Sequence, residues 1–366
     1  MAIDEELAEA NLVLYGGTCP NCGGLISDER LSRGAPCSDC LPSVEGGFLG
    51  LSQVVGELRR LRNLKNLKEF ANALEEEKKL CEFFRSCVGS EPWSIQKLWI
   101  RRISKKSSFA MIAPTGIGKT TLGLVAALYY SFKGRKSYFI VPTTTLVMQA
   151  ERKLIEFLNR KGSAASILAI HSKLRKRERE ERERRLEDPR GFDILITTSR
   201  YFVKNYDKIS KHDFTFIFVD DVDAVLRGSK AINYLLELMG FTDEDIEDAL
   251  KIIKLKRELG VRSESSELLE ELRKLRSRLE KRKNTNKVLI IASATGNPRG
   301  LKVRLFRELI GFEIGARPEL IRNIEDTYLK VRDLEEAVEE VTRLVRESLG
   351  GGGLIYVLVA LGIGFA

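Results

Sequence analysis

Residues 109–121 read FAMIAPTGIGKTT, and this stretch decides the fold. Four apolar residues are typical of a short buried strand, and a helical pattern begins after the loop that follows them. Gly116 and Gly118 let the backbone N–H groups of the loop curl around a phosphate, and the helix N-terminus adds positive partial charge. Strand, glycine loop, lysine and hydroxyl together predict a P-loop.

We interpret this loop as the ATP site of the chain. Lys119 is placed to reach the β- and γ-phosphates, and the hydroxyl of Thr120 is placed to bind Mg²⁺. Ala113 stands where the general pattern has its first glycine. The residues assigned to nucleotide binding are Pro114, Thr115, Gly116, Ile117, Gly118, Lys119, Thr120 and Thr121.

A second acidic motif supports the ATP interpretation. The apolar residues 214–219 predict a strand, and DDVD follows at 220–223. We expect Asp220 to hold Mg²⁺ and Asp221 to orient and deprotonate the attacking water, so Lys119, Asp220 and Asp221 are the candidate catalytic residues. An ordinary acidic turn would explain one aspartate, but not its combination with Lys119.

Gln96 lies upstream in PWSIQKLW, residues 92–99. A side-chain amide both donates and accepts, so Gln96 could read the edge of an adenine. The alternative is a solvated surface glutamine, which is the more usual state of this residue type.

Six short apolar runs alternate with amphipathic stretches and predict a doubly wound α/β domain with a parallel, RecA-like sheet. They span residues 109–113, 137–141, 166–170, 193–197, 214–219 and 288–292. Residues 230–286 are rich in Leu, Glu, Lys and Arg and predict a helical insertion. The charged run 175–185 is interpreted as a solvated helix face, with DNA contact as the alternative.

Four cysteines form two C-x-x-C pairs separated by 14 residues. Cys19, Cys22, Cys37 and Cys40 would supply a tetrahedral Cys₄ shell for structural Zn²⁺. Free or disulfide-bonded cysteines are the alternative. Cys81 and Cys87 lie in a helical, apolar setting and are expected to be buried thiols.

The composition limits which partners and which cellular compartment we expect for this chain. The formal net charge is +9, which favours a polyanionic partner without identifying one. The first residues are acidic where a secretory signal would be basic, and no apolar run reaches membrane-spanning length. We therefore expect a cytoplasmic monomer with no membrane association. The many Glu, Lys and Arg residues suit a thermophile.

The motif set resembles superfamily-two helicases related to DEAD-box proteins. Gln96 resembles the Q motif, residues 113–120 motif I, and DDVD the Asp-Glu-Ala-Asp box, with Asp221 one methylene shorter than the usual Glu. The resemblance implies that hydroxyls and backbone groups of two further motifs contact a DNA backbone, while a third motif couples nucleotide to nucleic acid. These residues are Pro142, Thr143, Thr144, Thr197, Thr198 and Ser199 for contact, and Ser293, Ala294 and Thr295 for coupling.

The combination of a Cys₄ finger with these motifs resembles, more specifically, the N-terminal part of the reverse gyrase family. That resemblance covers almost the whole chain. It implies double- and single-stranded DNA as partners, a hyperthermophilic source, a type IA topoisomerase domain in the full-length chain, and ATP-dependent positive supercoiling. Another zinc-bearing superfamily-two helicase and a non-enzymatic nucleic-acid-binding module are the alternatives.

We predict four parts from these patterns: a zinc finger at 1–50, a helical linker at 51–90, a first RecA-like domain at 91–325, and the start of a second RecA-like domain at 326–366. In the last part, strands are expected at 328–331 and 353–359 around a helix at 334–349. Because the arginine finger would lie beyond these residues, we expect weak ATP hydrolysis by this chain alone.

Overall fold

The computed structural model describes residues 13–43, 49–220, 229–259, 266–282, 286–293, 301–314 and 334–348. The chain divides into two units, 1–318 and 319–366. In the second unit the described element is helix α16 (Leu334–Ser348), which closely matches the predicted helix at 334–349. The predicted strands at 328–331 and 353–359 lie outside the described residues.

A parallel sheet is the centre of the first unit. Among the described residues it has seven strands in the order β5-β6-β4-β7-β8-β3-β9, and every pairing is parallel. The strands are β3 (Phe109–Ile112), β4 (Lys136–Val141), β5 (Ile167–Ile170), β6 (Ile194–Thr198), β7 (Phe214–Val219), β8 (Val288–Ser293) and β9 (Glu313–Ile314). The α/β prediction is confirmed, and the six predicted strands are present. The short edge strand β9 was not predicted, because two residues carry no periodicity.

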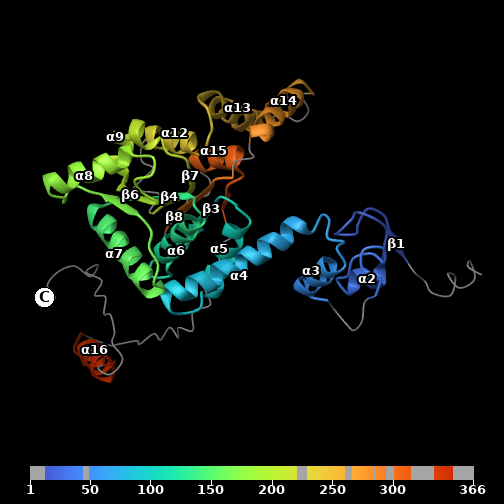
Figure 1. The fold of residues 1–366 in the computed structure, drawn as a ribbon, viewed down its shortest axis with the longest axis horizontal. Coiled ribbons are helices and arrows are strands. Elements are labelled where there is room, and N and C mark those ends of the chain that lie inside the picture. The colour runs from blue at the N-terminus through green and yellow to red at the C-terminus, as the bar shows by residue number, and fades with distance from the viewer. Residues whose placement is uncertain are drawn as a thin grey trace, which may run out of the picture. The chain divides into compact units, whose positions relative to one another are not determined.

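Helices cover both faces of the sheet, which is why its strands consist mainly of apolar residues. Figure 1 shows α6 (Lys119–Phe132) and α7 (Thr144–Lys161) on one face, and α9 (Ser199–Lys204), α12 (Ser229–Leu238) and α15 (Leu301–Ile310) on the other. Outside α6 and α7 lie α4 (Lys68–Val88) and α5 (Ser94–Ser104), and α8 (Lys176–Glu187) and α10 (Tyr206–Ile209) pack near β5 and α9.

Gly123 permits the close approach of α6 to the sheet. A Cβ atom at this position would lie 2.5 Å from the ring of Phe218 on β7, well inside van der Waals contact. The Phe218 ring in turn stacks on Phe139 of β4 with 4.5 Å between ring centroids. The helix that follows the P-loop is therefore held directly against the central strands.

The predicted insertion contains two long helices, α13 (Asp243–Leu259) and α14 (Ser266–Arg282). Each begins with acidic residues and is basic towards its end, which suits the helix dipole. Arg278 near the end of α14 lies 3.6 Å from Asp248 near the beginning of α13, so the helices are antiparallel and their opposite charges meet. The basic residues of the insertion are thus partly neutralised within it.

The cysteine-rich region folds around a small core of its own. A two-stranded antiparallel sheet, β1 (Leu14–Tyr15) and β2 (Ile26–Ser27), leads into the short helix α2 (Asp28–Ser32). Helix α3 (Leu51–Arg60) buries Val54 and Leu58 in the same cluster as the cysteines. No helix among the described residues is both long enough and apolar enough to cross a bilayer.

Both histidines of the chain are buried, and we expect them to make folding sensitive to pH. Burial lowers the pKa of His171 and of His212 below the ordinary value of 6.5, because the charged form is poorly solvated. Among the described side chains, the Nδ1 atom of His171 has no hydrogen-bond partner, and His212 Nε2 bonds to the carbonyl of Leu186 at 2.6 Å.

The depressed folded-state pKa values mean that the unfolded chain binds more protons below about pH 6.5. The stability that the neutral histidines contribute is complete above this pH and is lost as the pH falls. Denaturant unfolding at pH 7 and pH 5.5 should show a smaller loss of stability in the His171→Gln/His212→Gln variant than in the parent chain. Equal losses would contradict the prediction.

Candidate nucleotide site and metal centre

The predicted site residues meet at one edge of the sheet because parallel strands end on the same side. The P-loop follows the end of β3, and Asp220 follows the end of β7. Pro142 follows β4, and Ser293 is the last residue of β8. Ligands of open α/β sheets bind outside the carboxyl ends of the strands, so this edge is the expected position for a nucleotide.

The P-loop has the backbone conformation that its glycines allow. Gly116 and Gly118 have φ values of +85° and +82°. A Cβ atom on Gly118 would also lie 2.6 Å from Nε2 of Gln96. Both the positive φ and this close contact therefore disfavour a larger residue at position 118. Lys119 Nζ donates to the carbonyls of Ala113 and Pro114 at 2.5 and 2.8 Å. The lysine side chain thus occupies the mouth of its own loop.

Thr120 and Asp220, 100 residues apart in the chain, are in direct contact. The Thr120 hydroxyl donates to the Asp220 carboxylate at 2.7 Å. The backbone N–H of Asp220 donates to the carbonyl of Ile140 at 2.8 Å, which fixes the end of β7 beside β4. A hydroxyl and a carboxylate oxygen so close together are a suitable ligand pair for Mg²⁺. Asp221 lies outside the described residues.

Gln96 is buried rather than solvated, with 6% of its surface exposed. Its Oε1 accepts from the N–H of Trp93 at 2.9 Å, and its Nε2 donates to the carbonyl of Ile117 at 3.0 Å. The amide therefore joins the first turn of α5 to the P-loop.

The end of β8 is bonded to the beginning of the P-loop. Ala113 N–H donates to the carbonyl of Ser293 at 3.2 Å, and Ser293 is buried. A movement of the P-loop would therefore displace the end of β8, and the reverse also holds. Ala294 and Thr295 lie outside the described residues.

The residues expected to contact DNA lie at the ends of two neighbouring strands, since Val141 at the end of β4 pairs with Thr198 at the end of β6. Two of their hydroxyls cap helices: Thr143 accepts from the N–H of Leu146, and Thr198 accepts from the N–H of Tyr201. Both capped helices begin at the edge that carries the P-loop, where their N-termini suit an anion.

Thr197 differs from its neighbours because its side chain is fully buried. Its hydroxyl bonds to that of Tyr138 at 2.7 Å. The Thr197 hydroxyl is therefore engaged inside the protein, whereas Thr198 and Ser199 are half-buried.

The four predicted metal ligands form one cluster. The Sγ atoms of Cys19, Cys22, Cys37 and Cys40 all lie within 4.8 Å of one another, and those of Cys22 and Cys37 are 3.6 Å apart. Tetrahedral Zn²⁺ with bonds of about 2.3 Å would place its sulfurs about 3.8 Å apart. The arrangement thus fits zinc with little movement.

Backbone groups stabilise the thiolate form of Cys19. Burial raises its pKa, but N–H groups of Cys37, Cys22 and Asn21 outweigh burial and lower the pKa to about 6. The Cys37 N–H lies 3.3 Å from Cys19 Sγ. Such bonds disperse the charge of a zinc-bound sulfur and orient it.

Asn21 is a supporting residue that the sequence did not reveal. It is fully buried, and its Nδ2 donates to Cys40 Sγ at 3.2 Å and to the carbonyl of Asn63 at 2.8 Å. Its Oδ1 accepts from the N–H of Lys65 at 2.9 Å. One side chain thus joins the metal centre to the segment between α3 and α4. Asparagine is a common turn residue, so its presence between the two cysteines of a C-x-x-C pair did not indicate that it supports the metal centre.

Comparison with known families defines the class of protein. Residues 93–250 match the DEAD/DEAH box helicase family, and residues 11–54 match the reverse gyrase zinc finger. The chain therefore joins a zinc finger to a helicase-type P-loop domain, and the cysteine cluster belongs to that finger.

The relatives of the chain are reverse gyrases, and the chain spans about a quarter of their length. The chain is 41% identical to reverse gyrase 1 of Aeropyrum pernix over 377 aligned positions, 42% identical to reverse gyrase of Thermococcus kodakarensis over 369, and 42% identical to reverse gyrase 1 of Aquifex aeolicus over 347. These alignments cover 96%, 96% and 94% of this chain but 27%, 21% and 28% of the relatives. The chain is a homologue of the reverse gyrases and corresponds to their N-terminal zinc finger and helicase-like region.

Similar solved structures include a DEAD box protein from the hyperthermophile Methanococcus jannaschii, with a TM-score of 0.44, 15% identity and coverage of 75% of this chain and 61% of that one. The RNA helicase Prp28 from Chaetomium thermophilum bound to ADP has a TM-score of 0.41 and 15% identity, with coverage of 74% and 55%.

Proposed function

We propose that this chain is an ATP- and DNA-binding motor segment, and that in the whole protein it drives ATP-dependent positive supercoiling of DNA. The contact between Thr120 and Asp220 carries the nucleotide part of the proposal, because it brings the two Mg²⁺ ligands of a P-loop site together. The relatives named reverse gyrase carry the supercoiling part.

In this proposal ATP–Mg²⁺ would displace three internal contacts. Phosphate oxygens would replace the carbonyls of Ala113 and Pro114 as partners of Lys119, and Thr120 and Asp220 would hold Mg²⁺. The proposed phosphate-binding residues are those assigned above, from 114 to 121, because the N–H groups of residues 115–121 would line the loop around the phosphates.

Gln96 would bind the adenine. Its Nε2 also donates to the carbonyl of Ile117, so the same side chain contacts the P-loop. Asp221 is proposed as the residue that positions the attacking water.

The proposed DNA contacts follow the same edge of the sheet. Thr143 and Thr144 at the start of α7, and Thr198 and Ser199 at the start of α9, would contact backbone phosphates without reading the base sequence. The bond from Ala113 to the Ser293 carbonyl supports a coupling role for residues 293–295, since it joins the nucleotide loop to the end of β8. The four-part division at 1–50, 51–90, 91–325 and 326–366 remains a prediction.

Asp220→Asn tests the nucleotide site. The amide keeps a hydrogen-bonding partner for Thr120 but removes the charge that would hold the ion. We expect the gain in affinity of an ATP analogue on adding Mg²⁺ to fall by roughly tenfold, because Mg²⁺ relies on one or two carboxylates. Titrations with and without added Mg²⁺, in buffer free of chelators so that zinc stays bound, measure this gain. An equal Mg²⁺ effect in both proteins would reject the assignment.

A further inference from the structure

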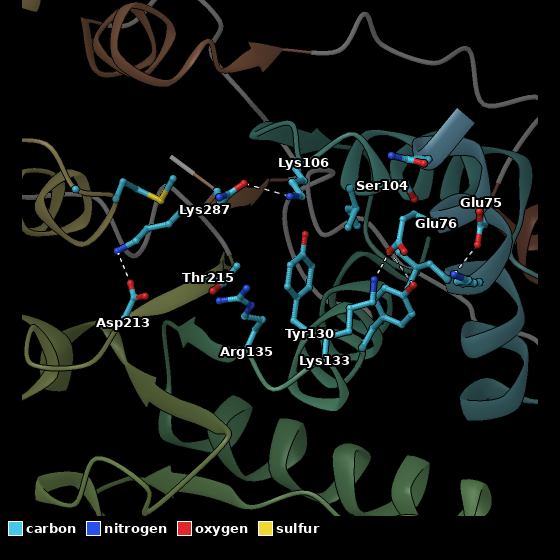
Figure 2. Close-up of a pocket in the computed structure, with 18 residues that line it drawn as sticks. Glu75, Glu76, Ser104, Lys106, Tyr130, Lys133, Arg135, Asp213, Thr215 and Lys287 are labelled. Atoms are coloured by element: carbon cyan, nitrogen blue, oxygen red, sulfur yellow. Dashed lines mark hydrogen bonds and ion pairs between the residues drawn. The ribbon is translucent and has the colours of Figure 1, made fainter. Parts of the chain in front are cut away.

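A cavity of about 850 Å³ lies at the edge of the sheet opposite to the P-loop. Its lining includes Arg135, Thr215 and Lys287, which lie at the beginnings of β4, β7 and β8, and Lys106, which precedes β3 (Figure 2). Helix α4 contributes the acidic residues of the opposite wall. Since the strands are parallel, their whole length separates this cavity from the nucleotide edge.

Each carboxylate in the lining has a lysine of its own. The pairs are Lys79–Glu75 at 2.8 Å, Lys133–Glu76, and Lys287–Asp213 at 2.9 Å. These contacts neutralise the three acids and three of the five cations. Lys106 and Arg135 are the two cations that remain.

Lys106 and Arg135 have no carboxylate partner within the part of the chain that the structure describes. Lys106 Nζ donates to the neutral Oδ1 of Asn286 at 3.1 Å, and both cationic side chains are exposed. Lys106 also has a φ of +55°, a conformation in which glycine would be unstrained.

A neutral donor lines the cavity together with the two cations. Figure 2 shows the Tyr130 hydroxyl pointing towards the side of the cavity where Lys106 lies, with Arg135 beside the Tyr130 ring. The Tyr130 ring is held by stacking on Phe216, with 5.0 Å between centroids. Burial raises the pKa of Tyr130, so its hydroxyl stays protonated and able to donate.

We propose that this cavity binds a phosphate group through Lys106, Arg135 and Tyr130. A phosphate has several terminal oxygens and carries more than one negative charge, which matches two uncompensated cations and a hydroxyl donor. The planar fork of Arg135 suits two of those oxygens, and Lys106 acts as a point charge. The volume lies within the range of small-ligand sites. A free phosphate compound and the backbone of a DNA strand share this chemistry.

Inorganic pyrophosphate is the first probe. Because the P-loop would also bind it, the titrations use the full chain carrying Lys119→Ala. In this background, Lys106→Ala/Arg135→Ala should weaken pyrophosphate binding at least tenfold, as roughly expected for the loss of two charge-assisted contacts. Tyr130→Phe keeps the stacked ring and should weaken binding roughly threefold. The matched control is Arg152→Ala/Lys153→Ala, which removes two exposed cations of α7 and should leave the affinity unchanged.

A single-stranded 12-nucleotide DNA without terminal phosphates distinguishes the two sources. If a DNA strand is the ligand, the Lys106→Ala/Arg135→Ala variant binds this DNA more weakly than the α7 control variant at the same salt concentration, and pyrophosphate competes with it. If a free phosphate compound is the ligand, only the pyrophosphate affinity falls. The proposal is overturned if both probes bind the two double variants equally, or if pyrophosphate fails to bind the Lys119→Ala background.

Discussion

Replacing Cys37 with serine is expected to release zinc and to unfold the finger while the motor sheet remains folded. Structural zinc contributes about 10–16 kcal/mol to folding in small zinc modules, so the loss of one ligand removes much of the finger's stability. The core of this module consists of the cysteines and a few aliphatic side chains, including Ile26, Val54 and Leu58. Such a core is too small to hold the fold without metal.

Zinc analysis of the purified protein and limited proteolysis measure this outcome. We expect the zinc content of Cys37→Ser to fall from one ion per chain towards zero, and early cleavage between residues 13 and 66. Cys81→Ser is the matched control, because Cys81 is a half-buried thiol of α4 outside the cluster. Retention of one zinc ion and full resistance to protease in Cys37→Ser would show that the cluster is not a structural metal site.

Lys119→Ala is expected to weaken ATP binding by roughly 100-fold, because two charge-assisted contacts to phosphate are lost. Lys119 bonds to two carbonyls of its own loop, so the ammonium is already placed where a phosphate would lie. The α6 helix that follows should be undisturbed, since Gly123 and its neighbours hold it against β7. Loss of binding would therefore reflect the missing charge.

A fluorescent ATP analogue titrated into both proteins measures this effect, and circular dichroism confirms the fold. Lys153→Ala, an exposed lysine of α7, serves as the control for net charge. If Lys119→Ala binds the analogue within threefold of the parent chain, the P-loop is not the nucleotide site. If neither protein binds the analogue, a chain that binds DNA but no nucleotide is the better description.

The strand–loop–helix at 109–132 and the cysteine pairs could be predicted from the sequence, because the groups that form each of them are close together in the chain. A glycine loop before a helix and two C-x-x-C pairs each bring their own groups together over a few residues. The strands could also be located, since a sheet covered on both faces leaves continuous apolar runs. The edge strand β9 could not, because only pairing with β3 marks it.

Contacts across long separations required the fold. The sequence proposed a common role for Thr120 and Asp220, but their 2.7 Å contact depends on the order of β3, β8 and β7 in the sheet. Gln96 was assigned to adenine from its position before the P-loop, and the structure adds its bond to Ile117. The burial of Thr197 was likewise invisible, since its neighbours have the same chemical character.

Local sequence was thus sufficient for the P-loop, the metal ligands and the class of sheet, because each depends on residues a few positions apart. The tertiary structure was required for the support that Asn21 gives to the zinc cluster and for the cationic cavity around Lys106 and Arg135. The cavity residues precede different strands and share no motif. Their proximity follows from parallel pairing, which brings the beginnings of distant strands to one edge of the sheet.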